Sequence, residues 1–173
     1  MNAGKVFEGE IKDSIQKHNE KENDIYILRL TDSASGFGMD SNATRFSAKS
    51  PFDFLFHKRN GITIAAELKS TIGTSISFSL TDEKSMIKAS QVKNLKKTNF
   101  YGIKSGFLFN FRKFEKTFWV DIVDFASFAD NTMKKSINIK DVEEYGGIII
   151  PQHLKKVKYL YDVDLLFEGE NNV

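Results

Sequence analysis

The amino-acid sequence predicts an α/β domain in which helices flank a mixed β-sheet. In some segments apolar residues recur at helical spacing, in others they alternate or run together, and the two kinds of segment are interspersed along the chain. The chain has 173 residues, which suits a single domain spanning residues 1–173. Hydrophobic residues make up 40% of it, enough to form a buried core and to exclude disorder of the whole chain.

The N-terminal part predicts a helix followed by a strand. A four-residue apolar spacing predicts a helix over residues 4–17, with the stripe Phe7, Ile11 and Ile15. Residues 25–30 are rich in β-forming side chains and predict a strand. Residues 31–49 contain glycine and serine without sustained periodicity, so we expect a flexible loop there.

The C-terminal two thirds predict alternating helices and strands. Asp82 or Thr81 can cap a helix that begins near Lys84. The full set of expected elements after the central hairpin is a helix over 84–97, strands over 105–111 and 117–123, short helices over 124–131 and 139–145, and a last strand over 159–167.

The central hairpin can be assigned a register. If Arg59, Asn60 and Gly61 form a three-residue loop with Gly61 left-handed, Asp53 falls opposite Glu67. One face then carries Asp53, Leu55, His57, Thr63, Ala65, Glu67 and Lys69. The other face carries only apolar side chains: Phe52, Phe54, Phe56, Ile62, Ile64, Ala66 and Leu68. A two-residue loop would mix the two sets, so the apolar pattern selects the first register.

This register brings chemically useful side chains to one face. Asp53 and Glu67 would repel each other, and a divalent cation between them would remove that cost. Mg²⁺ prefers oxygen ligands and is often held by one or two carboxylates and a substrate phosphate. Lys69 on the same face could orient or activate a water for attack on a phosphodiester. The competing interpretation is a solvated strand face with a surface ion pair of little consequence.

Composition limits the possible functions. The chain has no cysteine and three histidines, which excludes disulfide scaffolds and thiolate metal sites and disfavours a multi-histidine zinc site. Residues 84–116 hold nine basic side chains and one acidic side chain, Glu115. Such a block suits a polyanion such as nucleic acid, although a solvated lysine-rich helix face is the simpler interpretation. No apolar run is long enough to span a membrane, and no signal peptide is apparent, so we expect a cytoplasmic protein.

Several motifs resemble a known nuclease family. The segment Ser50-Pro51-Phe52-Asp53 followed by Glu67-Leu68-Lys69 resembles the PD-(D/E)xK nuclease superfamily. Other segments, in the same order, are similar to the RecU family of Holliday-junction resolvases; they lie in residues 4–11, 69–80, 91–108, 135–146 and 161–164. That family has a longer stalk where this chain has residues 31–49, so the sequence resembles a compact relative, for example a phage-encoded one.

The resemblance implies a fold, a function and a set of residue roles. The fold would be restriction-endonuclease-like, and the protein would be a metal-dependent DNA endonuclease that resolves four-way junctions as a homodimer. Asp53 and Glu67, with Glu8 from the first helix, would bind Mg²⁺ or Mn²⁺. Lys69 would position the attacking water, and Gln91 would approach the site. The expected DNA contacts are Arg45, Lys49, Ser70, Lys88, Lys93 and Lys97.

Three alternatives remain open on the sequence. The first is another nuclease of the same superfamily, of the repair or restriction type, with the same site and a different substrate. The second is a noncatalytic nucleic-acid-binding module that uses the basic residues 84–116. The third is a structural domain with a surface carboxylate pair. Metal-dependent cleavage of DNA would distinguish the nuclease hypotheses from the second and third alternatives.

Overall fold

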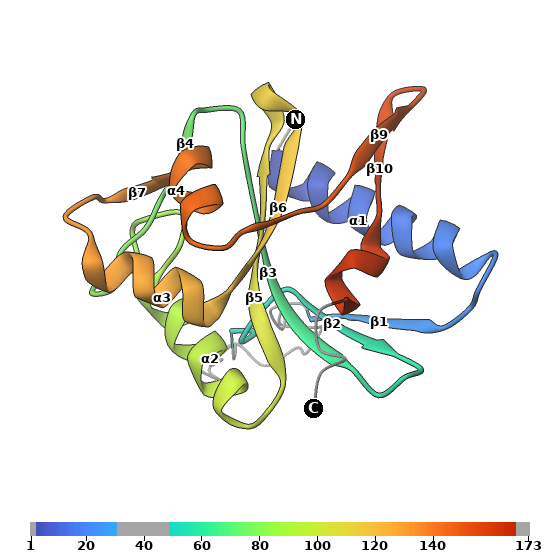
Figure 1. Cartoon of the computed structure of the whole chain (residues 1–173), viewed down its shortest axis with the longest axis horizontal. Helices are drawn as coiled ribbons and strands as arrows, with labels where there is room; N and C mark the ends of the chain where they lie inside the picture. Colours follow the sequence, from blue (N-terminus) through green and yellow to red (C-terminus); the bar gives the residue numbers. More distant parts are fainter. Residues whose placement is uncertain (1–2, 31–48, 169–173) are drawn as a thin grey trace, which may run out of the picture.

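The structure, a computed structural model, describes residues 3–30 and 49–168. It confirms the α/β class, because a six-stranded mixed sheet in the order β1-β2-β3-β5-β6-β8 is flanked by helices (Figure 1). The expected loop over residues 31–49 and the expected DNA contact Arg45 lie outside the described residues, except for Lys49 at the loop's end. No helix in the described ranges is long and apolar enough to cross a membrane.

The elements follow one another as mixed helices and strands. In chain order they are α1 (Ala3–Asn19), β1 (Ile25–Arg29), β2 (Phe54–Lys58), β3 (Thr63–Thr71), β4 (Ser75–Ser77), α2 (Ala89–Phe100), β5 (Lys104–Phe111), η1 (Arg112–Phe114), β6 (Lys116–Asp121), α3 (Ile122–Asn131), β7 (Ser136–Asn138), α4 (Ile139–Glu144), β8 (Ile148–Ile149), β9 (Gln152–Lys155), β10 (Lys158–Tyr161) and η2 (Val163–Phe167).

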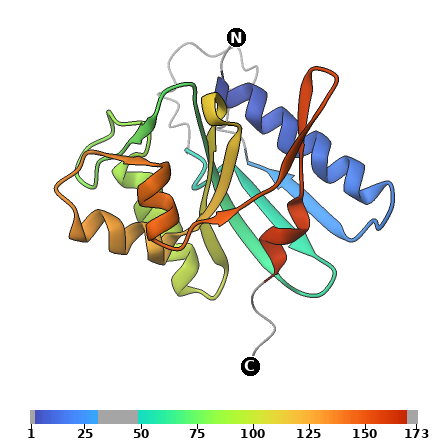
Figure 2. The same cartoon turned by 45° about the horizontal axis from the view of Figure 1, so that its top comes forward.

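Different helices cover the two faces of the sheet. Strands β1, β2 and β3 are antiparallel neighbours, whereas β3 and β5 run parallel and are joined through α2. Figures 1 and 2 show α1 on one side of the sheet and α2 with α3 on the other. Each side has its own apolar core: Phe7, Ile11 and Ile15 of α1 pack in one, and Val92 and Leu95 of α2 pack in the other.

The predicted hairpin register is confirmed. Leu55 pairs with Ala65 and His57 pairs with Thr63, which is the register of a three-residue loop. Gly61 has a φ of 97°, a left-handed conformation that glycine adopts without steric cost. The Lys58 amide donates to the Ile62 carbonyl at 2.9 Å and so closes the loop.

One residue of the hairpin prediction is wrong. Phe52 is buried, but it packs in the core on the α2 side and not with Phe54 and Phe56 on the α1 side. Strand β2 begins only at Phe54, and the amide of Asp53 donates to the Ala66 carbonyl at 3.1 Å, outside the regular ladder. The strict alternation of faces therefore ends before Phe52.

The boundaries of two other elements also differ from the prediction. Helix α2 begins at Ala89, not near Lys84, because Asp82 caps a local turn: its Oδ1 accepts from the Lys84 amide at 2.8 Å. The expected last strand over residues 159–167 divides into β10 and the 3₁₀ helix η2. The short strands β4, β7, β8 and β9 were not predicted from the sequence.

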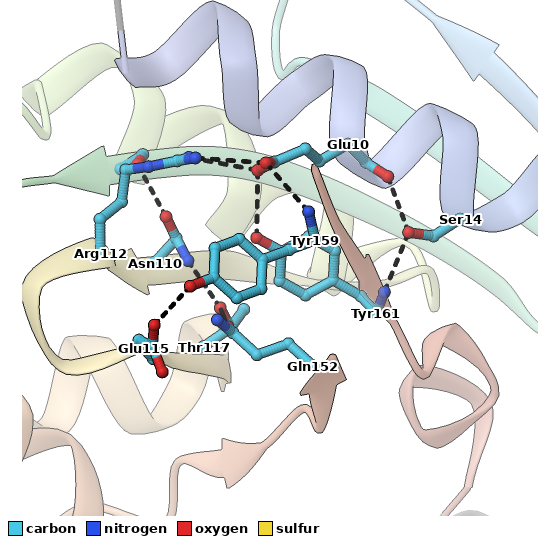
Figure 3. Close-up of polar contacts among 10 residues, drawn as sticks. Glu10, Ser14, Asn110, Arg112, Glu115, Thr117, Gln152, Tyr159 and Tyr161 are labelled. Carbon is cyan, nitrogen blue, oxygen red and sulfur yellow. Dashed lines mark hydrogen bonds and ion pairs between the residues drawn. The ribbon is translucent and has the colours of Figure 1, made fainter. Parts of the chain in front are cut away.

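A buried polar network ties α1 to the C-terminal hairpin (Figure 3). The Glu10 side chain is 2% exposed, and its two carboxylate oxygens accept from Nη1 and Nη2 of Arg112, each at 3.2 Å. The Tyr159 amide and the Tyr161 hydroxyl also donate to this carboxylate, each at 3.3 Å. The Ser14 hydroxyl accepts from the Tyr161 amide at 3.0 Å. Glu10 therefore has charge and hydrogen-bond partners from η1 and β10, which favours a structural role.

Candidate active site

The β2–β3 hairpin and the residue before it place two carboxylates at one cleft, with an ammonium against one of them. Glu67 and Lys69 lie two positions apart on β3 and so project from the same face. Asp53 lies directly before β2, and its Oδ2 accepts from the Leu68 amide at 2.8 Å. The backbone of β3 thus orients the Asp53 carboxylate beside that of Glu67.

Helix α2 supplies the partner that holds Glu67. Glu67 Oε1 accepts from Lys69 Nζ at 2.9 Å and also from Gln91 Nε2. Gln91 lies in the first turn of α2, where its own Oε1 accepts from the Lys88 amide at 3.0 Å. One glutamine side chain therefore caps the helix and reaches the carboxylate, as the resemblance implied for the approach of Gln91 to the site.

Both carboxyl groups of the pair are held in an environment that disfavours their charge. Glu67 is 4% exposed, and burial raises its pKa to about 7, against the lowering effect of Lys69 and with a further raise from the Asp53 charge. Burial also raises the pKa of Asp53, and this outweighs the hydrogen bond from the Leu68 amide. The charges of Lys69 and Arg29 act against this effect on Asp53 but do not cancel it.

The residues around the pair form a cleft whose rim carries three basic side chains and the acidic Glu83. Its volume is about 300 Å³, and its lining includes Asp53, Glu67 and Gln91. The basic side chains that line it are Arg29, Lys49 and Lys88. The Asp53–Glu67 pair therefore belongs to a cleft, which disfavours the interpretation as an open strand face.

Glu8 is placed next to this site rather than inside the cleft. Its carboxylate forms an ion pair with Arg29 at the end of β1. Its negative charge still acts on the pair, since it raises the pKa of both Asp53 and Glu67. A role for Glu8 as a third metal ligand stays a prediction, because its carboxylate would have to leave Arg29 to coordinate the ion.

The expected DNA contacts are distributed unevenly. Lys49 and Lys88 line the cleft, while Lys93 and Lys97 are exposed on α2. Ser70 does not fit a DNA surface: its side chain is 8% exposed and its hydroxyl donates to Asn110 Oδ1 at 2.8 Å. On β3 the position after Lys69 faces the α1 side of the sheet, away from the cleft.

The basic residues 84–116 do not form one surface. Arg112 is paired with the buried Glu10, Lys116 is paired with Glu143, and Lys104 Nζ donates to the Leu166 carbonyl at 3.1 Å. Of the basic residues in this block, Lys88, just before α2, lines the cleft. The positive charge counted over residues 84–116 therefore overstates the positive electrostatic field at the cleft.

The donor set at the cleft fits a hard divalent cation. Carboxylate oxygens are the ligands that Mg²⁺ prefers, and a cation would offset the desolvation that raises both pKa values. Within residues 3–30 and 49–168, the group of three side chains whose ligand atoms lie within 4.8 Å of one another is a different one, His18, Glu22 and Asp164. There both ring nitrogens of His18 already contact carboxylates, and Lys58 Nζ donates to Asp164 at 2.6 Å, so the group is an ion-pair network.

The raised pKa of Glu67 predicts a pH-dependent stability in metal-free protein. Folding raises this pKa from 4.5 to about 7, so the folded state holds the proton more tightly than the unfolded chain. The stabilisation is complete below pH 4.5 and is lost as the pH rises through about 7. In chelator, the melting temperature should fall from about pH 5 to about pH 8, and should fall less in Glu67→Gln.

Added Mg²⁺ should reverse this trend. A proton competes with the metal for the Glu67 carboxylate. Mg²⁺ should therefore raise the melting temperature more at about pH 8, where Glu67 is ionised, than at about pH 5, where it is protonated. Equal stabilisation by Mg²⁺ at both values would contradict Glu67 as a ligand.

The sequence did not indicate two charged residues of the cleft, Arg29 and Glu83. Arg29 reaches it from the end of β1, where the strand pattern alone gives no sign of a role. Glu83 lines the cleft and is held by α2, because its Oε1 and Oε2 accept from the amide and hydroxyl of Ser90 at 2.9 and 2.7 Å. Its side chain acts from outside the helix as a cap, which spacing along the chain does not reveal.

Comparisons with known proteins show a distant structural likeness. No protein-family model matches the chain, and a search of curated proteins finds no match. Among solved structures, a Holliday junction resolvase from Archaeoglobus fulgidus, an archaeal hyperthermophile, is similar: the identity is 13%, the match covers 80% of this chain and 94% of that chain, and the TM-score is 0.45. The likeness is too distant to assign an activity.

Proposed function

We propose that the protein is a metal-dependent DNA endonuclease. The observation that carries this is the pair of desolvated carboxyl groups, Asp53 and Glu67, in a cleft that Gln91 and three basic side chains also line. Carboxylates in such a pair are typical ligands of a divalent cation in phosphoryl-transfer sites. The basic side chains at the cleft suit a substrate with phosphate groups, and nucleic acid is the proposed substrate class.

Each residue has a role that follows from its contacts. When bound, Mg²⁺ would neutralise charge on the scissile phosphate and polarise it towards attack. Asp53 and Glu67 would hold the ion, each fixed by a partner on β3 or α2. Lys69 Nζ, which lies against Glu67 Oε1, would orient the attacking water. Arg29 and Lys88 at the cleft would draw the phosphate backbone towards it.

The finer proposal is a Holliday-junction resolvase that acts as a homodimer in the cytoplasm. It is supported by the resemblance of the chain to the RecU family, whose motifs include the residues now found at the cleft. A symmetric four-way junction presents two equivalent phosphodiesters, and a twofold dimer would present two equivalent cleavage sites. Mg²⁺ is the proposed metal, with Mn²⁺ as the alternative.

A cleavage assay tests both the proposed nuclease activity and the finer proposal of a Holliday-junction resolvase. The chain would be incubated with a four-way junction and with a linear duplex of the same arms, in Mg²⁺, in Mn²⁺ and in chelator. We expect metal-dependent nicks placed symmetrically in the junction and little cleavage of the duplex. Equal cleavage of both DNAs would indicate another nuclease of the same superfamily. Salt-sensitive binding without cleavage in either metal would refute the nuclease and favour a binding module.

The exposed lysines of α2 should contribute to DNA affinity. Reversing the charge of Lys93 and Lys97 together should weaken binding and lower the slope of log affinity against log salt by about two. A matched double reversal of Lys155 and Lys156, exposed at the end of the β9–β10 hairpin, should change the slope little. Fluorescence anisotropy across a salt titration measures both. Equal effects of the two double variants would place the DNA on another surface.

A further inference from the structure

Two neighbouring aromatic side chains at the end of α2 are exposed to solvent. Phe100 is 83% exposed and Tyr101 is 70% exposed. Their rings pack edge to face, with centroids 5.4 Å apart and an angle of 83° between the planes. Neither belongs to the two core clusters. The core therefore does not account for this aromatic pair, and an exposed apolar surface of this kind is typical of a binding contact.

A row of side chains on α2 connects the aromatic pair with the cleft. Ser90, Asn94, Lys97 and Tyr101 follow one another at intervals of four, three and four residues, so they lie on one side of the helix. Ser90 and Asn94 line the cleft beside Glu67. Lys97 lies beyond them and is exposed. The row thus begins at the candidate catalytic carboxylates and ends at the aromatic pair.

The surface along this row is basic. Lys93 and Lys96 are exposed on the same helix, and residues 89–101 contain no acidic side chain; the acid near the row is Glu83, which Ser90 binds at its cleft end. An elongated surface with lysines and a terminal aromatic pair has the two components that bind single-stranded nucleic acid. Lysines hold the phosphates and aromatic rings stack on bases.

We propose that a DNA strand leaving the cleft follows this row, and that an unpaired base stacks on Tyr101, which Phe100 supports. The inference rests on the proposed nuclease function and adds the feature of the DNA that is recognised, an unstacked base near the cut. The ten residue steps from Gln91 to Tyr101 span roughly 15 Å at 1.5 Å per step. That length is about four base steps at 3.4 Å per step. Because stacking is sequence-tolerant, the pair would recognise an interruption of the duplex and not a sequence.

Equilibrium binding tests this contact without any cleavage. The chain, in chelator, would be mixed with four-way junctions that carry 2-aminopurine at successive distances from the branch point, and with a matched linear duplex. The Phe100→Ala/Tyr101→Ala double variant should lose about tenfold in affinity for the junction and less than about twofold for the duplex. The wild-type chain should alter 2-aminopurine fluorescence at one or two positions, the double variant at none. Tyr101→Phe retains the ring and should retain the signal.

Controls separate stacking from other causes. Tyr26→Ala removes another exposed aromatic, 62% exposed on the edge strand β1, and should change neither affinity nor fluorescence. An equal loss of affinity for junction and duplex, or an unchanged fluorescence signal in the double variant, would overturn the proposal. So would sedimentation showing that the double variant converts a dimer into monomers, because a second copy would then be the partner of the pair. A full 2-aminopurine signal with no metal-dependent cleavage would uphold this contact and refute the nuclease function.

Discussion

Replacing Asp53 by Asn or Glu67 by Gln should abolish DNA cleavage while leaving DNA affinity within about twofold. The amide has almost the shape of the carboxylate but lacks the charge that holds a divalent cation, whereas the lysines of α2 and of the cleft rim are unchanged. A loss of at least about a hundredfold in single-turnover rate is expected, since a bound metal supplies several kcal/mol of transition-state stabilisation. Junction cleavage in saturating Mg²⁺ and anisotropy in chelator measure the two quantities.

Stability measurements distinguish this result from misfolding. Glu67→Gln removes a buried carboxyl group whose desolvation raises its pKa to about 7, so the variant should melt at or above the wild-type temperature near pH 8 in chelator. It should also lose the stabilisation that Mg²⁺ gives the wild type. Glu143→Gln, which changes an exposed carboxylate on α4, is the matched control and should retain cleavage and metal response. Undiminished cleavage by Asp53→Asn or Glu67→Gln would refute that residue's role.

Lys69→Ala should separate metal binding from chemistry. Loss of the ammonium should reduce the single-turnover rate by roughly a hundredfold or more, in the range of a lost acid–base or orienting group. The Mg²⁺-induced rise in melting temperature should persist, because Asp53 and Glu67 remain. A variant that loses the metal response together with activity would assign Lys69 a structural role through its contact with Glu67.

The sequence predicted the β2–β3 hairpin because its signals are local. Gly61 marks the loop, and the alternation of apolar and polar side chains has one register that keeps the faces apart. The prediction extended that alternation by one residue too many on the Phe52 side, where the ladder ends at Phe54. The helix α1 was likewise predictable from the four-residue spacing of its apolar stripe.

The start of α2 and the partners of the cleft depend on contacts distant in sequence. Asp82 has the spacing of a helix cap, but Ile87 forms a bridge with Phe78 and is buried, so the helix does not begin before Ala89. Ser70 was predicted at the DNA surface because its neighbours in sequence are catalytic candidates. Its hydroxyl is bound by Asn110, forty residues away, on the other face of the sheet. The spacing of residues along the sequence alone could not reveal either contact.

Breaking the Glu10–Arg112 pair should lower the free energy of unfolding more than breaking an exposed ion pair. Arg112→Met removes the guanidinium and leaves the Glu10 carboxylate, 2% exposed, with only the donors from Tyr159 and Tyr161. Loss of one partner from a buried ion pair costs about 3–5 kcal/mol. For a domain of this size that corresponds to a fall in melting temperature of roughly 6–20 °C.

A double-mutant cycle shows whether uncompensated charge is the cause. Glu10→Gln/Arg112→Met leaves no buried charge and should recover part of the loss, since neutral replacement of a buried pair is far less costly than removal of one partner. Glu143→Gln breaks the exposed pair with Lys116, whose side chains are 48% and 41% exposed, and should cost less than about 1 kcal/mol. Chemical denaturation of these three variants, of Glu10→Gln and of the wild type gives the free energies of unfolding. If Arg112→Met costs no more than Glu143→Gln, then the network between α1 and β10 does not stabilise the fold.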